Sequence, residues 1–356
     1  MKAQVKRHAL LETLGIVKSV VPGKSTLPIL TNILLQAKDG QLTLTGTDLE
    51  NALISSCKAK VEKSGAMAIP PALLESFLKQ VQDESISIES KGKVVAIQAG
   101  AVRSTLPVLP AQDFPPIPKV KKGKGFMLAN LEKGLKEVSY AMAKDESRPV
   151  LHGIYLSQSG NKVELAAADG FRLAITSVPG KGLPERVILS AETVLLLLKT
   201  MKGQVEGDYQ KDDEERAILS LRQNETTLIT HAVSGNFPNY QQLVPKKGKL
   251  IKVSTDSLKN ALKIVMVAKP SKDKVDLRTK GQSLVVSGRN NDTEQSTEST
   301  IPVKGRGKIA FNGKFLSDIL SRSGEMVELR ITNPQSPGVV RQNGTIHVLM
   351  PMFNQW

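Results

Sequence analysis

The chain of 356 residues contains a single cysteine, Cys57, and few aromatic residues. One cysteine excludes an intramolecular disulfide framework and a cysteine-cluster metal site. Its place in the apolar segment Leu53–Cys57 predicts a packed core thiol. Aromatic side chains make up only 4% of the chain, which argues against stacking of nucleic-acid bases on aromatic platforms as the main binding mode.

Long hydrophobic runs are also missing. Apolar runs such as Val194–Leu198 are far too short to span a bilayer. The first fourteen residues, MKAQVKRHALLETL, lack the long apolar core and small-residue cleavage site of a secretory signal. We therefore expect a cytoplasmic protein that does not contact a membrane.

Signatures of catalysis are absent as well. The sequence holds no G-x-S-x-G or H-E-x-x-H motif, and its four histidines are widely separated. Asp169 lies close to Arg172, but an aspartate in this position is expected to cap its own turn rather than to transfer protons. The sequence therefore predicts a protein that is not an enzyme and that holds no metal or cofactor.

Gly23–Thr26 imitates the end of a phosphate-binding loop. Such a loop needs a glycine five residues before Gly23, where Lys18 stands, and it needs a helix directly after it. Pro28 favours extended chain instead. Nucleotide binding is therefore not expected.

Positive charge is in excess. The 49 Lys and Arg residues against 34 Asp and Glu residues give a net charge of +15. A chain this basic is typical of proteins that bind a polyanion. A lysine-rich surface that reflects only the composition of the genome would give the same total, so composition alone leaves both readings open.

An internal repeat organises the chain. One pattern, a short strand and then a helix with an apolar stripe, occurs in Gln4–Val20, Phe126–Met142 and Ile251–Val267. The stripes are Leu10/Leu14/Val17, Leu131/Leu135/Val138 and Leu258/Leu262/Val265. A second strand-and-helix pattern occurs in Met67–Val81, Val187–Met201 and Lys308–Arg322, with Ser190 and Asn312 as expected N-caps and Pro71 in a first helical turn.

Strand pairs lie between and after these helices. The clearest is Val163–Ser177, VELAAADGFRLAITS, in which Asp169-Gly170 predicts a hairpin turn. Breaker-rich stretches at 107–124 and 245–249 are expected linkers, and Glu206–Arg216 an exposed acidic loop. We therefore predict an α+β fold of three repeated units, each with two helices backing antiparallel strands, and with domains at 1–119, 124–246 and 249–356.

Several motifs carry a family resemblance. RPVLHGI (148–154), AADGFRLA (167–174), FPNYQQLVP (237–245) and the terminal VLMPM (348–352) occur in this order. TLPILTN (26–32) and GTDLE (46–50) precede them. Together these motifs resemble the bacterial sliding clamp, the β subunit of the replicative DNA polymerase III holoenzyme, over the whole chain.

The resemblance implies a ring-shaped homodimer that encircles double-stranded DNA without reading its sequence and confers processivity on the polymerase. Lysines on the helices would meet phosphates without contacting base edges. The DNA-facing residues expected on this basis are Lys24, Lys79, Lys133, Lys136, Lys144, Lys199, Lys202, Lys259 and Lys263. The dimer contacts expected are Leu106, Ile264 and Val267, although Ser104 stands where the family often has an aromatic residue.

The resemblance also implies an apolar pocket that binds short linear peptides of the DNA polymerase subunit, the clamp loader and repair factors. The residues carried over are Leu151, Gly170, Phe171, Arg172, Leu173, Pro238, Leu243, Asn312, Phe315, Val348, Met350, Pro351 and Met352. Phe171 replaces a common histidine, Gln242 stands where an arginine is frequent, and the chain ends with an unusual tail, Phe353–Trp356. These differences leave the preferred peptide open, as do the competing packing roles of Leu151, Leu173 and Val348.

A second class of function fits the same composition. A basic protein that coats DNA electrostatically, without forming a ring, would bind linear DNA with a steep dependence on salt. A clamp would instead slide off open ends and persist on closed circles, so retention on the two forms separates the hypotheses.

Overall fold

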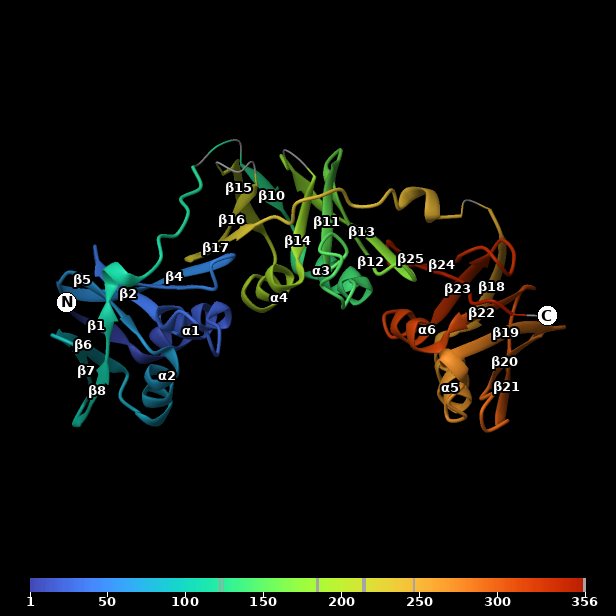
Figure 1. The fold of residues 1–356 in the computed structure, drawn as a ribbon, viewed down its shortest axis with the longest axis horizontal. Helices are drawn as coiled ribbons and strands as arrows, with labels where there is room; N and C mark the ends of the chain where they lie inside the picture. Colours follow the sequence, from blue (N-terminus) through green and yellow to red (C-terminus); the bar gives the residue numbers. More distant parts are fainter. Residues whose placement is uncertain (122, 124, 184–185, 213–215, 246, 355–356) are drawn as a thin grey trace. The chain divides into compact units, whose positions relative to one another are not determined.

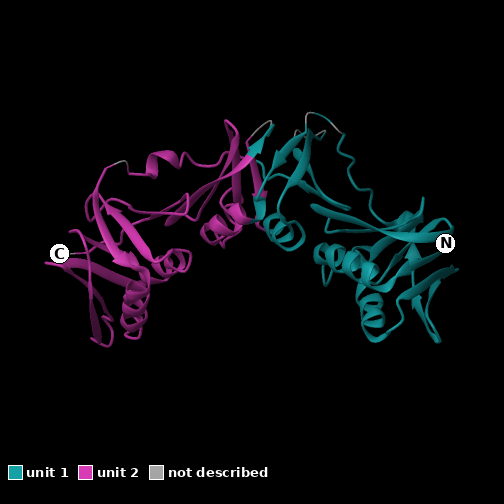
Figure 2. Cartoon of the chain, turned by 180° about the vertical axis from the view of Figure 1, so that it is seen from behind, with its two compact units in different colours: residues 1–132, 180–184, 192–234 teal, residues 133–179, 185–191, 235–356 magenta. Residues whose placement is uncertain are grey.

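The computed structural model describes residues 1–121, 123, 125–183, 186–212, 216–245 and 247–354. They form two compact units (Figure 2). Unit 1 comprises residues 1–132, 180–184 and 192–234, and unit 2 comprises residues 133–179, 185–191 and 235–356.

Unit 1 is built on antiparallel strands. They are β1 (Lys2–Lys6), β2 (Ile33–Lys38), β3 (Gln41–Thr47), β4 (Asn51–Lys63), β5 (Gly65–Ile69), β6 (Ser85–Lys91), β7 (Val94–Ala99), β8 (Val102–Pro107), β9 (Leu109–Pro110), β10 (Phe126–Leu128), β15 (Val205–Lys211), β16 (Ala217–Gln223) and β17 (Thr226–His231). β4 is a shared element, because it pairs with β1, β3 and β17 along its length.

Helices α1 (Arg7–Val17) and α2 (Pro71–Gln80) lie side by side against these strands (Figure 1), and all but the first residue of α4 (Ala191–Thr200) belongs to the same unit. Short 3-10 turns are η1 (Lys18–Val20), η2 (Pro28–Thr31) and η3 (Ala111–Asp113). The expected stripe of α1 is fully buried, since Leu10, Leu14 and Val17 have no exposed surface. Pro71 occupies the first turn of α2, as predicted.

Unit 2 is also built on antiparallel strands. They are β11 (Gly153–Ser159), β12 (Lys162–Ala168), most of β13 (Arg172–Lys181), β14 (Val187–Ser190), β18 (Lys249–Ser254), β19 (Lys274–Lys280), β20 (Ser283–Arg289), β21 (Ser296–Pro302), β22 (Lys308–Asn312), β23 (Met326–Ile331), β24 (Gly338–Gln342) and β25 (Thr345–Leu349). β13 pairs with β12 on one side and with β25 on the other, so the last strand of the chain joins the central hairpin.

The helices of unit 2 are α3 (Leu131–Val138), most of which lies in this unit, α5 (Thr255–Met266) and α6 (Gly313–Leu320). The 3-10 turns are η4 (Ser139–Ala141), η5 (Gln241–Leu243) and η6 (Ser271–Asp273). α5 and α6 lie side by side (Figure 1), and their buried faces join one apolar core with the strands. Asn312 caps α6, as predicted, because its side-chain oxygen accepts hydrogen bonds from the backbone N–H groups of Lys314 and Phe315 at 3.0 and 3.2 Å.

The predicted α+β architecture is confirmed. Each of the six strand-and-helix segments is a strand followed directly, or within two residues, by a helix. The elements of the middle repeat are distributed over both units, with β15–β17 in unit 1 and β11 and β12 in unit 2. The predicted hairpin is confirmed as well, since β12 and β13 pair in register from Lys162↔Pro179 to Ala168↔Leu173.

One prediction for the middle of the chain is wrong. Val205–Lys211 is strand β15 and not part of an exposed acidic loop. The acidic side chain at its centre, Asp208, is buried. Its partners compensate the cost of burying the charge, since it accepts a hydrogen bond from the backbone N–H of Gly123 at 3.0 Å and lies 2.6 Å from the guanidinium of Arg222. Residues 213–215 of that predicted loop lie outside the described residues.

Cys57 is half-buried at the border of the core of unit 1, and burial raises the pKa of its thiol. Within the described ranges, no helix has the length and apolarity needed to cross a membrane. In the same ranges, His, Cys, Asp and Glu side chains form no group of three or more suited to holding a metal ion.

Candidate functional site

The site in unit 2 starts from the turn between β12 and β13. Asp169 caps this turn, since its Oδ1 accepts hydrogen bonds from the backbone N–H groups of Phe171 and Arg172, both at 2.9 Å. Gly170 has a φ of +91°, a conformation that side chains with a Cβ rarely adopt. The turn therefore presents Phe171 outward and directs Arg172 into the protein.

Arg172 is buried between two carboxylates. Its side chain is only 4% exposed, and its Nε donates to Asp169 Oδ2 at 2.9 Å. Its Nη1 donates to Asp318 on α6. A buried guanidinium needs carboxylate partners. One partner, Asp169, lies in the turn and the other, Asp318, lies on α6, so Arg172 connects the turn to the helix.

Aromatic rings surround the same guanidinium. The Arg172 Cζ atom lies 4.4 Å from the centroid of the Phe315 ring and 5.2 Å from that of Tyr140. Arg322 approaches the Tyr140 ring at 4.3 Å, and the Tyr140 hydroxyl lies 2.8 Å from Nδ1 of His347. Burial raises the pKa of Tyr140 and lowers that of His347 to about 4. At neutral pH both side chains are therefore uncharged.

An apolar rim lies above this polar floor. Phe171 is 62% exposed and Met350 is 37% exposed, and the Phe171 and Phe315 ring centroids are 6.3 Å apart. The backbone N–H of Met350 donates to the carbonyl of Phe171 at 2.9 Å, which holds the end of β25 against the turn. Exposed apolar side chains held this close together are suited to an apolar ligand.

The opposite face of the sheet carries other predicted residues. Leu173 and Val348 are directly paired across β13 and β25, and both are buried. Strand alternation places them on the same face as Tyr155 of β11. Phe237 stacks on Tyr155 at 5.1 Å, so the segment that carries Pro238 and Leu243 lies over this face. Both of those side chains are exposed.

Leu151 belongs to a loop that lies close both to the Gly170 turn and to Gly235, which precedes the Phe237–Pro245 segment. Its backbone N–H donates to the carbonyl of Arg148 at 2.9 Å, and Nη1 of Arg148 is 3.5 Å from the point that a Cβ on Gly170 would occupy. Its neighbour Val150 lies so close to Gly235 that a Cβ there would be 2.7 Å from Val150 Cγ1. Leu151 itself is buried, which is also what a packing role would give.

The end of the chain forms a second hollow. Met352 donates its backbone N–H to the carbonyl of Ala310 in β22 at 2.8 Å, and Asn354 accepts a hydrogen bond from Lys274 at 3.1 Å. A cavity of about 320 Å³ is lined by Lys308, Pro334, Gln335, Pro351, Met352, Phe353 and Asn354. Gln355 and Trp356, which belong to the unusual tail, lie outside the described residues.

The structure places Gly170, Phe171, Arg172, Phe315 and Met350 close together, whereas Leu173 and Val348 lie on the opposite face of the sheet and Pro351 and Met352 line the cavity at the end of the chain. Sequence reasoning missed four members of the polar floor beneath the apolar rim, which are Tyr140, Asp318, Arg322 and His347. They come from elements far apart in the chain, and each is an ordinary residue for its helix or strand. Only the spacing of Phe315, Asp318 and Arg322, three and four residues apart, indicates that these three share one helical side.

The predicted DNA-facing lysines are placed on helices or just beyond them. Exposed side chains are those of Lys133 and Lys136 on α3, Lys199 on α4 and Lys263 on α5, together with Lys24, Lys144 and Lys202 in loops; Lys259 on α5 is half-buried. Lys79 on α2 pairs with Glu75 at 2.7 Å. Lys18 and Lys79 together lower the pKa of Glu75, so part of the positive charge at Lys79 is neutralised.

The predicted contacts of the dimer lie at sheet and helix ends. β8 pairs only with β7 among the described strands, and Val102 on it is half-exposed. Leu106 on the same strand has its side chain buried in the core of unit 1, so only its backbone lies at the edge. In unit 2, Ile264 and Val267 are exposed at the end of α5, at 51% and 71%.

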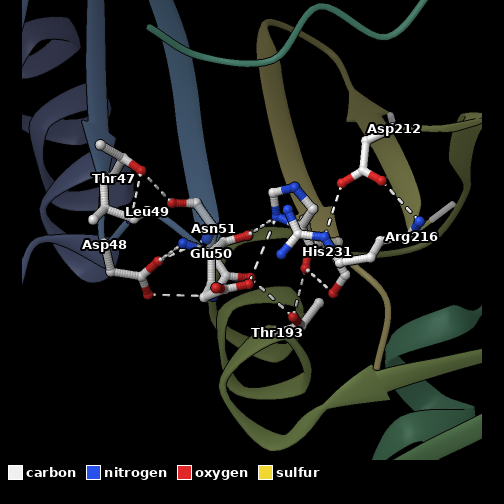
Figure 3. Close-up of polar contacts among 10 residues, drawn as sticks. Thr47, Asp48, Leu49, Glu50, Asn51, Thr193, Asp212, Arg216 and His231 are labelled. Atoms are coloured by element: carbon white, nitrogen blue, oxygen red, sulfur yellow. Dashed lines mark hydrogen bonds and ion pairs between the residues drawn. The ribbon is translucent and has the colours of Figure 1, made fainter. Parts of the chain in front are cut away.

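A related turn occurs in unit 1, between β3 and β4 (Figure 3). Asn51 donates to Asp48 at 3.2 Å and accepts a hydrogen bond from the Thr193 hydroxyl of α4 at 2.9 Å. His231 Nδ1 lies 3.2 Å from the carbonyl oxygen of Glu50. In the repeat, the polar residues Asn51, Thr193 and His231 stand at the positions that Arg172, Phe315 and Met350 take in unit 2.

Repeated α+β units on antiparallel sheets, with lysines along their helices and an apolar rim at a strand end, define the class of DNA clamps. Family models of the DNA polymerase III beta subunit match residues 1–118 (N-terminal domain), 127–239 (central domain) and 241–353 (C-terminal domain). The chain belongs to this family, the bacterial sliding clamps, which are non-catalytic processivity factors of DNA replication.

Individual relatives agree over the full length. The beta sliding clamp of Pseudomonas putida is 29% identical, over 99% of this chain and 100% of the relative. The crystal structure of the DNA polymerase III subunit beta from Pseudomonas aeruginosa is 28% identical, with a TM-score of 0.92 over 99% of this chain and 100% of that one. A second Pseudomonas aeruginosa clamp, with griselimycin bound, gives a TM-score of 0.91 at 28% identity and the same coverage.

Proposed function

We propose that two copies of this chain close into a ring that encircles duplex DNA and tethers the replicative polymerase. The observation that carries this proposal is the repeated strand-and-helix unit, in which helices bearing exposed lysines recur through the chain. Ammonium groups on helices meet phosphates without reading bases, which permits sliding. The ring would consist of domains 1–119, 124–246 and 249–356 from each copy, in the cytoplasm.

The closure of the ring would join the first domain of one copy to the third domain of the other. An exposed edge strand, β8, carries Arg103 and Val102, and the other end offers Ile264 and Val267 beside the edge strand β21, where Glu298 is exposed. An unpaired strand edge is a template for pairing with another chain. Head-to-tail contact between different surfaces closes into a ring when the rotation allows.

The apolar rim of unit 2 would bind short linear peptides of the polymerase, the clamp loader and repair factors. The flexible side chain of Met350 adapts to varied apolar anchors, and the rings of Phe171 and Phe315 offer apolar surface beside it. We infer that griselimycin, which is bound to a relative from Pseudomonas aeruginosa, binds this chain as well.

Retention on DNA tests the ring. The protein is assembled with a clamp loader on nicked circular DNA, the excess is removed, and half of the sample is linearised. A ring remains on the circle and leaves the linear form, whereas a protein that coats DNA electrostatically is retained equally on both. Equal retention would therefore contradict the proposal and favour the alternative that the net charge of +15 also suits.

A further inference from the structure

Tyr140 lies under the pocket and not in it. It belongs to η4, and its ring is held between two guanidinium groups, with Arg172 at 5.2 Å and Arg322 at 4.3 Å from the ring centroid. Two cations on one ring would repel each other. They are compensated by Asp318, whose carboxylate accepts from Arg172 and whose backbone carbonyl accepts from Arg322 at 2.8 Å.

The Tyr140 hydroxyl is fixed from a fourth element. It lies 2.8 Å from Nδ1 of His347, a side chain of β25 that is only 1% exposed. Because burial keeps His347 neutral and the tyrosine protonated, the hydroxyl donates and Nδ1 accepts. The ring therefore cannot slide or rotate without breaking a buried hydrogen bond.

Arg172 transmits this placement to the rim. Its Nε holds Asp169, which caps the turn that carries Phe171, and its Nη1 holds Asp318 on the helix that carries Phe315. The separation of 6.3 Å between the Phe171 and Phe315 rings thus depends on where the guanidinium lies. The two rings come from separate elements, and Arg172 contacts both of these elements.

We propose that Tyr140, with Arg322 behind it, is a positioning residue for peptide binding: it holds Arg172 so that the Phe171 and Phe315 rings keep the spacing that admits an apolar anchor. The inference rests on the proposed function of the rim. A positioning role differs from a packing role in what a substitution changes. A residue that only packs in the core contributes to stability, whereas a positioning residue also determines the spacing of the two rings.

Binding of griselimycin to immobilised full-length protein tests the proposal. Tyr140→Leu removes the aromatic face and is expected to weaken binding about tenfold, the magnitude of a buried cation–π contact. Tyr140→Phe keeps that face but loses the hydrogen bond to His347, so it is expected to weaken binding less than Tyr140→Leu does. Arg322→Lys, a second variant that leaves Tyr140 intact, loses the planar stack and is expected to fall between them.

Leu284→Ala is the matched control. Leu284 is buried in the same core of unit 2, on β20, which pairs with β19 and β21 and not with the strands β13 and β25 that carry the rim, so this variant loses stability at a different place in the core. At a temperature low enough for this variant to stay folded, it is expected to bind griselimycin with the affinity of the wild type. If Leu284→Ala and Tyr140→Leu weaken binding equally, Tyr140 is a packing residue and the proposal is wrong.

A measurement without ligand tests the positioning role of Tyr140 separately from peptide binding at the rim. A 19F label on the ring of Phe315 reports the cation above it, and its chemical shift is expected to move in Tyr140→Leu and Arg322→Lys but not in Leu284→Ala. An unmoved shift would overturn the positioning role even if griselimycin bound. A moved shift in a protein that binds no griselimycin would support the positioning of Arg172 and contradict the peptide pocket instead.

Discussion

Asp48 and Asp169 make the same pair of hydrogen bonds in different units. Asp48 Oδ1 accepts from the backbone N–H groups of Glu50 and Asn51 at 3.0 and 2.6 Å, and Asp169 Oδ1 accepts from those of Phe171 and Arg172 at 2.9 Å each. After each turn the next strand pairs with a strand from far along the chain, β4 with β17 and β13 with β25. The internal repeat therefore extends to the detail of the turns.

The two turns differ at the residue after the aspartate. Leu49 has a φ of +83°, close to the +91° of Gly170, but it carries a side chain in a conformation that glycine adopts without strain. Leu49→Gly is therefore expected to stabilise unit 1 by about 1 kcal/mol, the strain relieved less the extra chain entropy of glycine. Urea unfolding followed by circular dichroism measures this change.

Gly170→Ala is the mirror-image control for that prediction. A Cβ at Gly170 would have no atom nearer than Arg148 Nη1 at 3.5 Å, so space is available and only the backbone conformation opposes it. This variant is expected to destabilise the protein by about 1 kcal/mol. A loss of stability in Leu49→Gly, or a gain in Gly170→Ala, would show that the positive φ costs nothing at these turns.

The sequence predicted the elements of the repeat better than the floor of the site. The hairpin at Asp169-Gly170 and the stripes such as Leu10/Leu14/Val17 are local signals, because turn chemistry and helical spacing lie within a few residues. The contact of Tyr140 with His347 joins residues 207 positions apart and leaves no local trace. Asp208 shows a related limit, since an acidic residue in a polar stretch is predicted to be exposed until its ion-pair partner, Arg222, is known.

The free energy of unfolding should decrease as the pH falls through the range in which His347 takes up a proton. Its pKa is depressed to about 4 in the folded protein by burial, and Arg322 lowers it further. The unfolded chain takes up this proton near pH 6.5, so the folded state loses stability progressively as the pH falls from about 6.5 to about 4. The total is about 3 kcal/mol at about 1.4 kcal/mol per pKa unit.

His347→Asn removes this titration and keeps an oxygen that can accept the Tyr140 hydroxyl. Its free energy of unfolding is expected to change less between pH 6.5 and 4.5 than that of the wild type, a range above most carboxylate titrations. Chemical unfolding at closely spaced pH values measures both curves. Parallel curves over that range would mean that His347 does not set the acid sensitivity.

The two exposed lysines at the end of α4, Lys199 on the helix and Lys202 just after it (together the α4 lysines), should contribute to the salt dependence of DNA binding. Removing two phosphate contacts in Lys199→Ala/Lys202→Ala is expected to reduce the slope of log K against log salt by up to about 2. Lys79→Ala should change the slope less, because Glu75 already compensates its charge. The pair Lys162→Ala/Lys280→Ala, which removes two exposed charges at hairpin turns, is the matched control. Equal slopes for both double variants would contradict the assignment of the α4 lysines.

The exposed apolar end of α5 should determine the oligomeric state. Ile264→Glu/Val267→Glu places carboxylates on side chains that are half or more exposed, so the fold tolerates them while an apolar interface does not. Sedimentation velocity is expected to show a monomer for this variant and a dimer for the wild type. Leu195→Glu, on the 63% exposed leucine of α4, should remain a dimer. A wild-type monomer at micromolar concentration would contradict the ring itself.

Two truncations distinguish the rim from the tail that follows it. A chain ending at Met352 keeps the hydrogen bonds of Met350 to Phe171 and of Met352 to Ala310, so it is expected to bind a fluorescent peptide with leucine and phenylalanine anchors within about twofold of the wild type. A chain ending at Pro351 loses the side chain that lines the cavity at the C-terminus, and its peptide binding is expected to be abolished. Both should elute as dimers in gel filtration, because the exposed ends of β8 and α5 are untouched. Undiminished peptide affinity in the shorter chain would refute the placement of Met352 in the pocket.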